Sequence, residues 1–108
     1  MRLRLGINTC FAVKRWPETN AWLRIVHDRL GLALIQHSFD LIPDGSSDAS
    51  AEALGADIRG AGGDLHSTFT GLAAYSGNLL LHPDPIQRAR AEAWFGWAIR
   101  YTAAAGGR

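Results

Sequence analysis

The chain has 108 residues, of which 47% are hydrophobic and 19% charged, the composition of a globular protein with one domain at most. Its formal charge is +1 and its eleven Lys and Arg residues are scattered, which argues against a nucleic-acid-binding surface. Cys10 is the single cysteine, which excludes an internal disulfide and a cysteine-based zinc site and favours a reducing, cytoplasmic setting. No apolar run approaches membrane-spanning length, so no membrane association is expected.

The amino-terminal segment has the pattern of one strand followed by one helix. Apolar residues alternate with basic residues and glycine over residues 2–7, which predicts a strand that ends around residues 8–11. A helix is expected from Pro17, because proline suits the first helical position and apolar residues then recur on one face. Gly31 is a typical residue at a helix end.

A second strand and helix follow. Residues 32–39 form a short, nearly continuous apolar run, as expected of a strand that is buried on both faces. After a turn over residues 43–47, a second helix is predicted over residues 48–59. Gly55 weakens this helix by about 1 kcal/mol relative to alanine.

The third unit is a strand over residues 64–70, a long loop over residues 71–83 and a helix from Pro85. The aromatic residues of this last helix indicate packing against the core. In the loop, Tyr75, Ser76 and Asn78 are candidate contacts of a ligand-covering lid, although turn formation explains them equally well. A fourth strand would be expected where the sequence ends.

Strand and helix thus alternate three times, which implies parallel strands joined by right-handed crossovers. Three such strands make an incomplete layer, whereas a closed barrel of this class needs eight units and about 250 residues. We therefore predict an α/β fold made of three βα units of an incomplete TIM (βα)8 barrel. Its two unpaired strand edges predict self-association.

Residues that alternate along a barrel strand point in turn toward the helices and into the lumen. Barrel enzymes build their active sites at the carboxyl ends of the strands. The polar side chains expected to face the lumen there are Asn8, Gln36, Ser38, Asp40, His66, Thr68 and Thr70.

Several of these residues have a structural interpretation beside the functional one. In the functional interpretation, His66 contacts a ligand: it binds a metal, holds a sugar oxygen or moves a proton. In the structural interpretation, it is a buried histidine whose hydrogen bonds go to neighbouring hydroxyls. Asp40 either accepts a substrate hydroxyl or is a local cap. His37, on the helix-facing side, is expected to be a packed core histidine, and His82 is expected to fix the start of the last helix in preference to binding phosphate.

Three stretches carry a family resemblance: LGINTCFAVKRWP, QHSFDL and HSTFTGLAAYSGNLLLHP. They resemble the xylose-isomerase-like TIM barrels, and within them sugar-phosphate isomerases and epimerases, the erythrulose-phosphate type among them. The resemblance covers residues 1–108 and implies the amino-terminal part of such a barrel. It also implies metal-assisted proton transfer next to a carbonyl on a small ketose or ketose phosphate.

In this family a divalent metal (Mn, Mg or Co) is held by carboxylates and a histidine from later strands, and two glutamates exchange the proton. No metal ligand or catalytic residue can be carried over to this chain, whose glutamates all fall on predicted helices. The substrate-binding candidates are Asn8, Ser38, Asp40, His66 and Thr68. The isolated chain is expected to be inactive.

Two other functions remain open from the sequence. The chain could be a small stand-alone α/β binding or oligomerising module, which a stable, monodisperse state would favour. A metal nuclease of the endonuclease IV type shares the barrel superfamily, but it would need a basic groove that the scattered charges do not provide.

Overall fold

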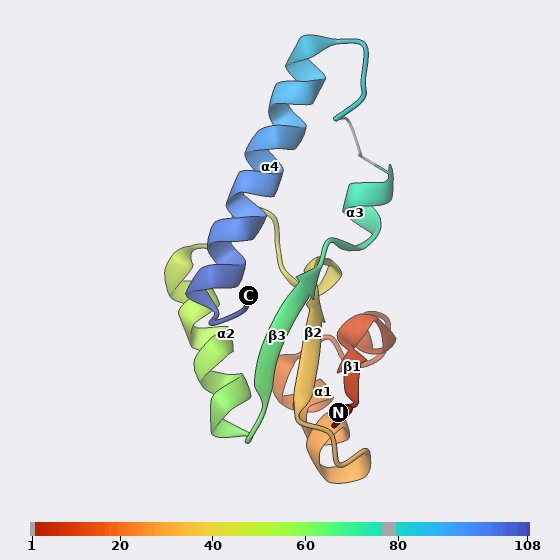
Figure 1. Cartoon of the computed structure of the whole chain (residues 1–108), viewed down its shortest axis with the longest axis vertical. Helices are drawn as coiled ribbons and strands as arrows, with labels where there is room; N and C mark the ends of the chain where they lie inside the picture. Colours follow the sequence, from red (N-terminus) through yellow and green to blue (C-terminus); the bar gives the residue numbers. More distant parts are fainter. Residues whose placement is uncertain (1, 77–79) are drawn as a thin grey trace.

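Three parallel strands in the order β1-β2-β3 form the sheet of the computed structural model, which describes residues 2–76 and 80–108 (Figure 1). The strands are β1 (Gly6–Asn8), β2 (Leu34–Ser38) and β3 (Asp64–Phe69). A helical segment follows each strand, so the predicted order of three βα units is confirmed.

The helical segments are of unequal length. Between β1 and β2 lie a 3-10 helix, η1 (Thr9–Ala12), and helix α1 (Thr19–Arg24), which continues as the π-helical stretch η2 (Ile25–Arg29). Between β2 and β3 lie the 3-10 helix η3 (Phe39–Leu41) and α2 (Asp48–Gly60), and β3 is followed by α3 (Gly71–Ser76) and the long α4 (Pro85–Ala104).

One face of the sheet is covered by α1, α2 and α4, and the core lies between this helical layer and the strands. Trp22 of α1, Ile35 of β2 and Ile58 of α2 are all fully buried there. The α4 helix packs beside α2 (Figure 1). Phe39 meets three aromatic rings of α4 at centroid distances of 5.5, 5.3 and 5.9 Å, which confirms the packing predicted for this helix; these are Trp94, Trp97 and Tyr101.

His37 lies in this core, as predicted for the helix-facing side of β2. Its side chain is buried, its Nδ1 lies 3.0 Å from the Thr9 hydroxyl, and its ring centroid lies 5.0 Å from that of Trp22. Burial lowers the pKa of His37 to about 4, because the charged imidazolium would lose its hydration. The residue is therefore a neutral core histidine at pH 7.

A bulge in β3 corrects part of the predicted orientation. Ile35 pairs with Leu65, but the next residue of β2, Gln36, pairs with Ser67, so His66 is the extra residue. Beyond the bulge the faces are exchanged, and Thr68 is paired with the core residue His37.

The lumen orientation predicted for Thr68 and Thr70 is therefore wrong. The Thr68 hydroxyl lies 2.8 Å from that of Thr102 in α4. Thr70 lines a cavity of about 290 Å³ together with Thr68 and α4 residues, Ile99 among them. Thr68 thus contacts α4, and Thr70, just after β3, lines the cavity between β3 and α4.

Residues 71–76, predicted as loop, form the short helix α3. One amide donor of its first turn is satisfied from a distant part of the chain: the Leu72 N–H donates to the two carboxylate oxygens of Asp40 at 2.9 and 3.1 Å. Gly71 has φ +74° and a Cβ there would lie 2.6 Å from an Asp40 oxygen, so glycine is required at this junction.

Candidate functional site

A row of polar side chains crosses the sheet on the face opposite the helical layer, with one residue from each strand. Asn8, Gln36 and Ser67 are neighbours in the strand register, and we call them the polar row. Asn8 Nδ2 donates to Gln36 Oε1 at 2.7 Å, and Gln36 Nε2 donates to Ser67 Oγ at 3.2 Å. The lumen orientation predicted for Asn8 and Gln36 is thus confirmed.

Ser67 is the member that the sequence analysis missed. Strict alternation placed it toward the helices, and only the bulge at His66 turns it to the open face. The sequence indicates this orientation only weakly: Ser67 is a polar residue between Leu65 and Phe69 on the side of the strand that was expected to be apolar.

The polar row lines an open hollow of about 300 Å³, together with His66 and short stretches of β1 and β2. Gly6 also lines it, and a Cβ at this position would lie 2.8 Å from the Leu34 carbonyl oxygen. Glycine therefore lets β1 approach β2 closely and adds no side chain to the hollow.

His66 stands at the rim of the hollow. Its side chain is exposed, so the interpretation as a buried histidine is wrong. The ring does meet a hydroxyl, since Nδ1 lies 3.2 Å from Ser67 Oγ. The backbone carbonyl oxygen of His66 accepts a hydrogen bond from the Arg108 N–H at 3.0 Å. This contact with the carboxyl-terminal residue holds the bulge in place.

Ser38 and Asp40 lie at the carboxyl end of β2 and form a separate junction. The buried Ser38 accepts the Asp40 N–H at 3.2 Å, and the Asp40 carboxylate binds the Leu72 N–H. Asp40 thus acts as a cap, although the helix it caps is α3 and not the turn directly after it. A substrate contact by either residue remains a prediction.

The five substrate-binding candidates are therefore distributed over three places. Asn8 and His66 share the hollow, Ser38 and Asp40 hold the start of α3, and Thr68 faces α4.

The described residues do not fit a divalent metal. Within residues 2–76 and 80–108, no three His, Cys, Asp or Glu side chains are grouped to hold an ion. The polar row supplies amide and hydroxyl groups, and the nearby carboxylate, Asp40, is already bound to a backbone N–H with both oxygens. A site for the metal of the family cannot be assembled from these groups.

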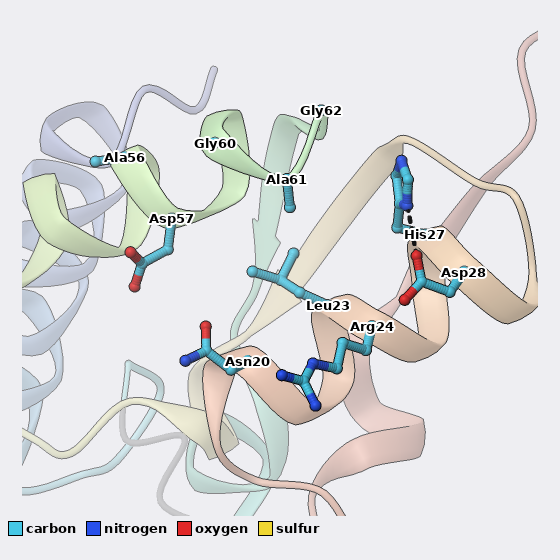
Figure 2. Close-up of a pocket in the computed structure, with 10 residues that line it drawn as sticks. All are labelled: Asn20, Leu23, Arg24, His27, Asp28, Ala56, Asp57, Gly60, Ala61 and Gly62. Atoms are coloured by element: carbon cyan, nitrogen blue, oxygen red, sulfur yellow. Dashed lines mark hydrogen bonds and ion pairs between the residues drawn. The ribbon is translucent and has the colours of Figure 1, made fainter.

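A larger hollow of about 770 Å³ lies between the α1–η2 segment and α2 (Figure 2). Its lining mixes apolar and charged side chains, including Leu23, Arg24 and Asp57, and the exposed His27 and Asp28 pair at 2.8 Å on its rim. It ends at Gly62, just before β3 begins, and is therefore at the amino-terminal end of the strands. In TIM barrels this end serves stability and the opposite end carries the chemistry.

The remaining candidates have structural roles or fall outside the description. His82 Nδ1 accepts the Asp84 N–H at 3.0 Å, which confirms its predicted role at the start of α4. In the proposed lid, the Ser76 hydroxyl donates to the Leu72 carbonyl at 2.9 Å, while Asn78 and the Tyr75 side chain lie outside the described residues. No helix in the described part of the chain is long and apolar enough to cross a membrane.

A comparison with solved structures finds a protein from Rhodospirillum rubrum, described as a "Putative Xylose isomerase", whose crystal structure was determined at 1.90 Å resolution. The two structures superpose with a TM-score of 0.85 at 38% sequence identity, and the match covers 98% of this chain. It covers 37% of the Rhodospirillum protein, so the chain spans just over a third of that relative. No protein-family model and no curated protein matches the sequence. On this fold and identity, the chain has the fold of part of a xylose-isomerase-like TIM barrel.

Proposed function

We propose that the chain supplies three βα units of a sugar isomerase or epimerase, an enzyme that moves a proton next to the carbonyl of a small ketose or ketose phosphate. The observation that carries this proposal is the polar row beside His66, on the sheet face opposite the helices, in a chain that is 38% identical to part of a protein described as a "Putative Xylose isomerase".

The chemistry of the hollow suits a neutral polyol. Side-chain amides, a hydroxyl and an imidazole offer both donors and acceptors, which sugar hydroxyls and carbonyls need. The described lining contains no carboxylate and no Lys or Arg, so it favours the hydroxyl and carbonyl portion of a ketose over its phosphate. In this proposal Asn8 and His66 bind and orient the sugar.

The other candidates act less directly. Ser38 and Asp40 position α3 beside the carboxyl end of the sheet, and Thr68 ties β3 to α4. The proton-transferring groups and the metal ligands of the proposed enzyme would come from βα units that this chain does not contain. We place this function in the cytoplasm, because the single cysteine of the chain favours a reducing compartment.

Joining this chain to the portion of the Rhodospirillum protein that it does not match would test the proposal. The chimeric barrel and the isolated chain would be assayed on ketoses and ketose phosphates with Mn²⁺, Mg²⁺ or Co²⁺. We expect turnover by the chimera and none by the isolated chain. A folded chimera that converts none of these sugars, or an isolated chain that converts one, would contradict the proposal.

A further inference from the structure

The hydrogen bonds of the polar row have a direction that can be read from the backbone. The Cys10 backbone N–H, which can only donate, is bound by Asn8 Oδ1 at 2.8 Å. This contact fixes which end of the Asn8 amide is the oxygen. The other end, Nδ2, is therefore the donor that faces Gln36.

The direction passes along the row. Because Asn8 Nδ2 donates to Gln36 Oε1, the Gln36 amide must present Nε2 to the third strand. Gln36 Nε2 in turn donates to Ser67 Oγ. The Ser67 hydroxyl is thereby an acceptor from Gln36, and its own proton is left for another partner.

Among the described residues, that partner is the imidazole of His66, whose Nδ1 lies 3.2 Å from Ser67 Oγ. We propose that the polar row fixes His66 as the tautomer with a bare Nδ1 and a protonated Nε2, so that the ring offers an N–H donor to a ligand in the hollow. Gln36 and Ser67 are then positioning residues that act through His66. No hydrogen bond joins Nε2 to any residue in the described ranges.

The tautomer determines what this side of the hollow can bind. A neutral imidazole with Nε2–H donates to an acceptor oxygen, whereas a bare Nε2 would accept from a hydroxyl. The site therefore selects a carbonyl oxygen or a hydroxyl lone pair of a small sugar at His66. This ligand assignment rests on the proposed function, but the tautomer itself does not.

The tautomer can be measured on the chain alone by long-range ¹H–¹⁵N correlation of ¹⁵N-labelled protein at pH 8.5, where ordinary imidazoles are neutral. Magic-angle spinning gives the same nitrogen signals from sedimented protein, so self-association does not prevent the measurement. We expect His66 Nδ1 to resonate as an unprotonated nitrogen and Nε2 as a protonated one.

Two variants test the cause. In Gln36→Glu the carboxylate can only accept, so Ser67 turns its proton toward residue 36 and accepts from Nδ1–H of His66, which reverses the tautomer. In Ser67→Ala the ring loses its partner and the two tautomers mix. His27 and His82, outside the row, serve as internal controls whose signals stay in place.

A wild-type His66 that carries its proton on Nδ1 would overturn the inference, as would an unchanged tautomer in Gln36→Glu. The two proposals can fail separately. An inactive chimera with the expected nitrogen signals would contradict only the proposed function. An active chimera with the opposite tautomer would contradict only this inference.

Discussion

Because of His37, the free energy of unfolding of the protein is expected to depend on pH. Burial lowers its pKa from 6.5 to about 4, so on acidification the unfolded chain takes up this proton before the folded chain does. The contribution is fully present above pH 6.5 and is lost as the pH falls from 6.5 to 4. The difference corresponds to about 3 kcal/mol at most.

We therefore expect the free energy of unfolding to decrease between pH 6.5 and 4, and His37→Gln, which keeps an acceptor for the Thr9 hydroxyl, to remove most of that slope. Urea titrations at a series of pH values measure it. His27→Gln, at an exposed position, is the matched control and should retain the slope. If the stability of His37→Gln decreased between pH 6.5 and 4 as steeply as that of the wild type, the acid sensitivity would come from other groups.

Asp40 is expected to matter for α3. Asp40→Ala leaves the Leu72 N–H without its carboxylate partner and should cost about 1 kcal/mol, as for other lost helix caps. Asp40→Asn keeps an acceptor oxygen and should cost less. Amide exchange of α3 residues and urea denaturation report both effects. Unchanged exchange and stability in Asp40→Ala would show that the cap contributes nothing and would leave the carboxylate available for a substrate.

Among single residues, those whose placement follows from a local pattern could be predicted. His37 and Asn8 lie before or outside the bulge, and their orientations follow from simple alternation. Ser67 and Thr68 lie beyond the bulge, which exchanges the two faces. A bulge depends on how neighbouring strands pair, and a single strand's sequence does not carry that information.

At the level of elements, the contact between α2 and the end of α4 depends on Gly55. The Ala105 carbonyl sits directly against the position of a Cβ at Gly55. From helix propensity alone, alanine at Gly55 should stabilise α2 by about 1 kcal/mol. Because its methyl group would collide with backbone, we expect Gly55→Ala to destabilise the protein by about 1–3 kcal/mol instead.

Gly96 of α4 provides the matched control, since its added Cβ would meet only the end of the Arg100 side chain at 3.5 Å. Gly96→Ala should therefore be neutral or stabilising by about 1 kcal/mol. Thermal and urea denaturation compare the two variants. Equal effects would mean that α2 and α4 do not approach as closely as described.

The elements themselves could largely be predicted, because hydrophobic periodicity and end signals are local. The helix over residues 48–59 is observed as Asp48–Gly60, and Pro85 begins α4 as expected. Two elements differ: the first strand, predicted over residues 2–7, is observed only as Gly6–Asn8, and α3 was not predicted as a helix. The α3 helix receives its cap from Asp40, more than thirty residues earlier in the chain. That stabilisation exists only after the sheet has formed, so the segment was predicted as a loop.

At the scale of the whole molecule, the chain exposes more surface and is more extended than is usual for its length. The accessible surface is 7044 Å², against about 5,900 Å² for a compact monomer of this mass. The radius of gyration is 14.8 Å, where about 13 Å is usual for this length. Large apolar side chains are exposed near β1 and on α4, such as Leu5 at 78% and Ile99 at 70%.

We expect the isolated chain to self-associate through these surfaces, and joining it to the rest of a barrel to abolish the association. Light scattering coupled to size-exclusion chromatography, over a range of concentrations, measures the mass. A monomer at every concentration with a sharp thermal transition would instead favour the stand-alone module.

The most direct test of the central claim, that this sheet face is a sugar-binding wall, is His66→Ala in the chimeric barrel. The exposed imidazole is not part of the core, so stability should change little. If His66 orients the sugar, kcat/KM should fall by about 100-fold or more. Turnover near that of the unmodified chimera would contradict the claim, and a simultaneous loss of several kcal/mol in stability would make His66 a structural residue.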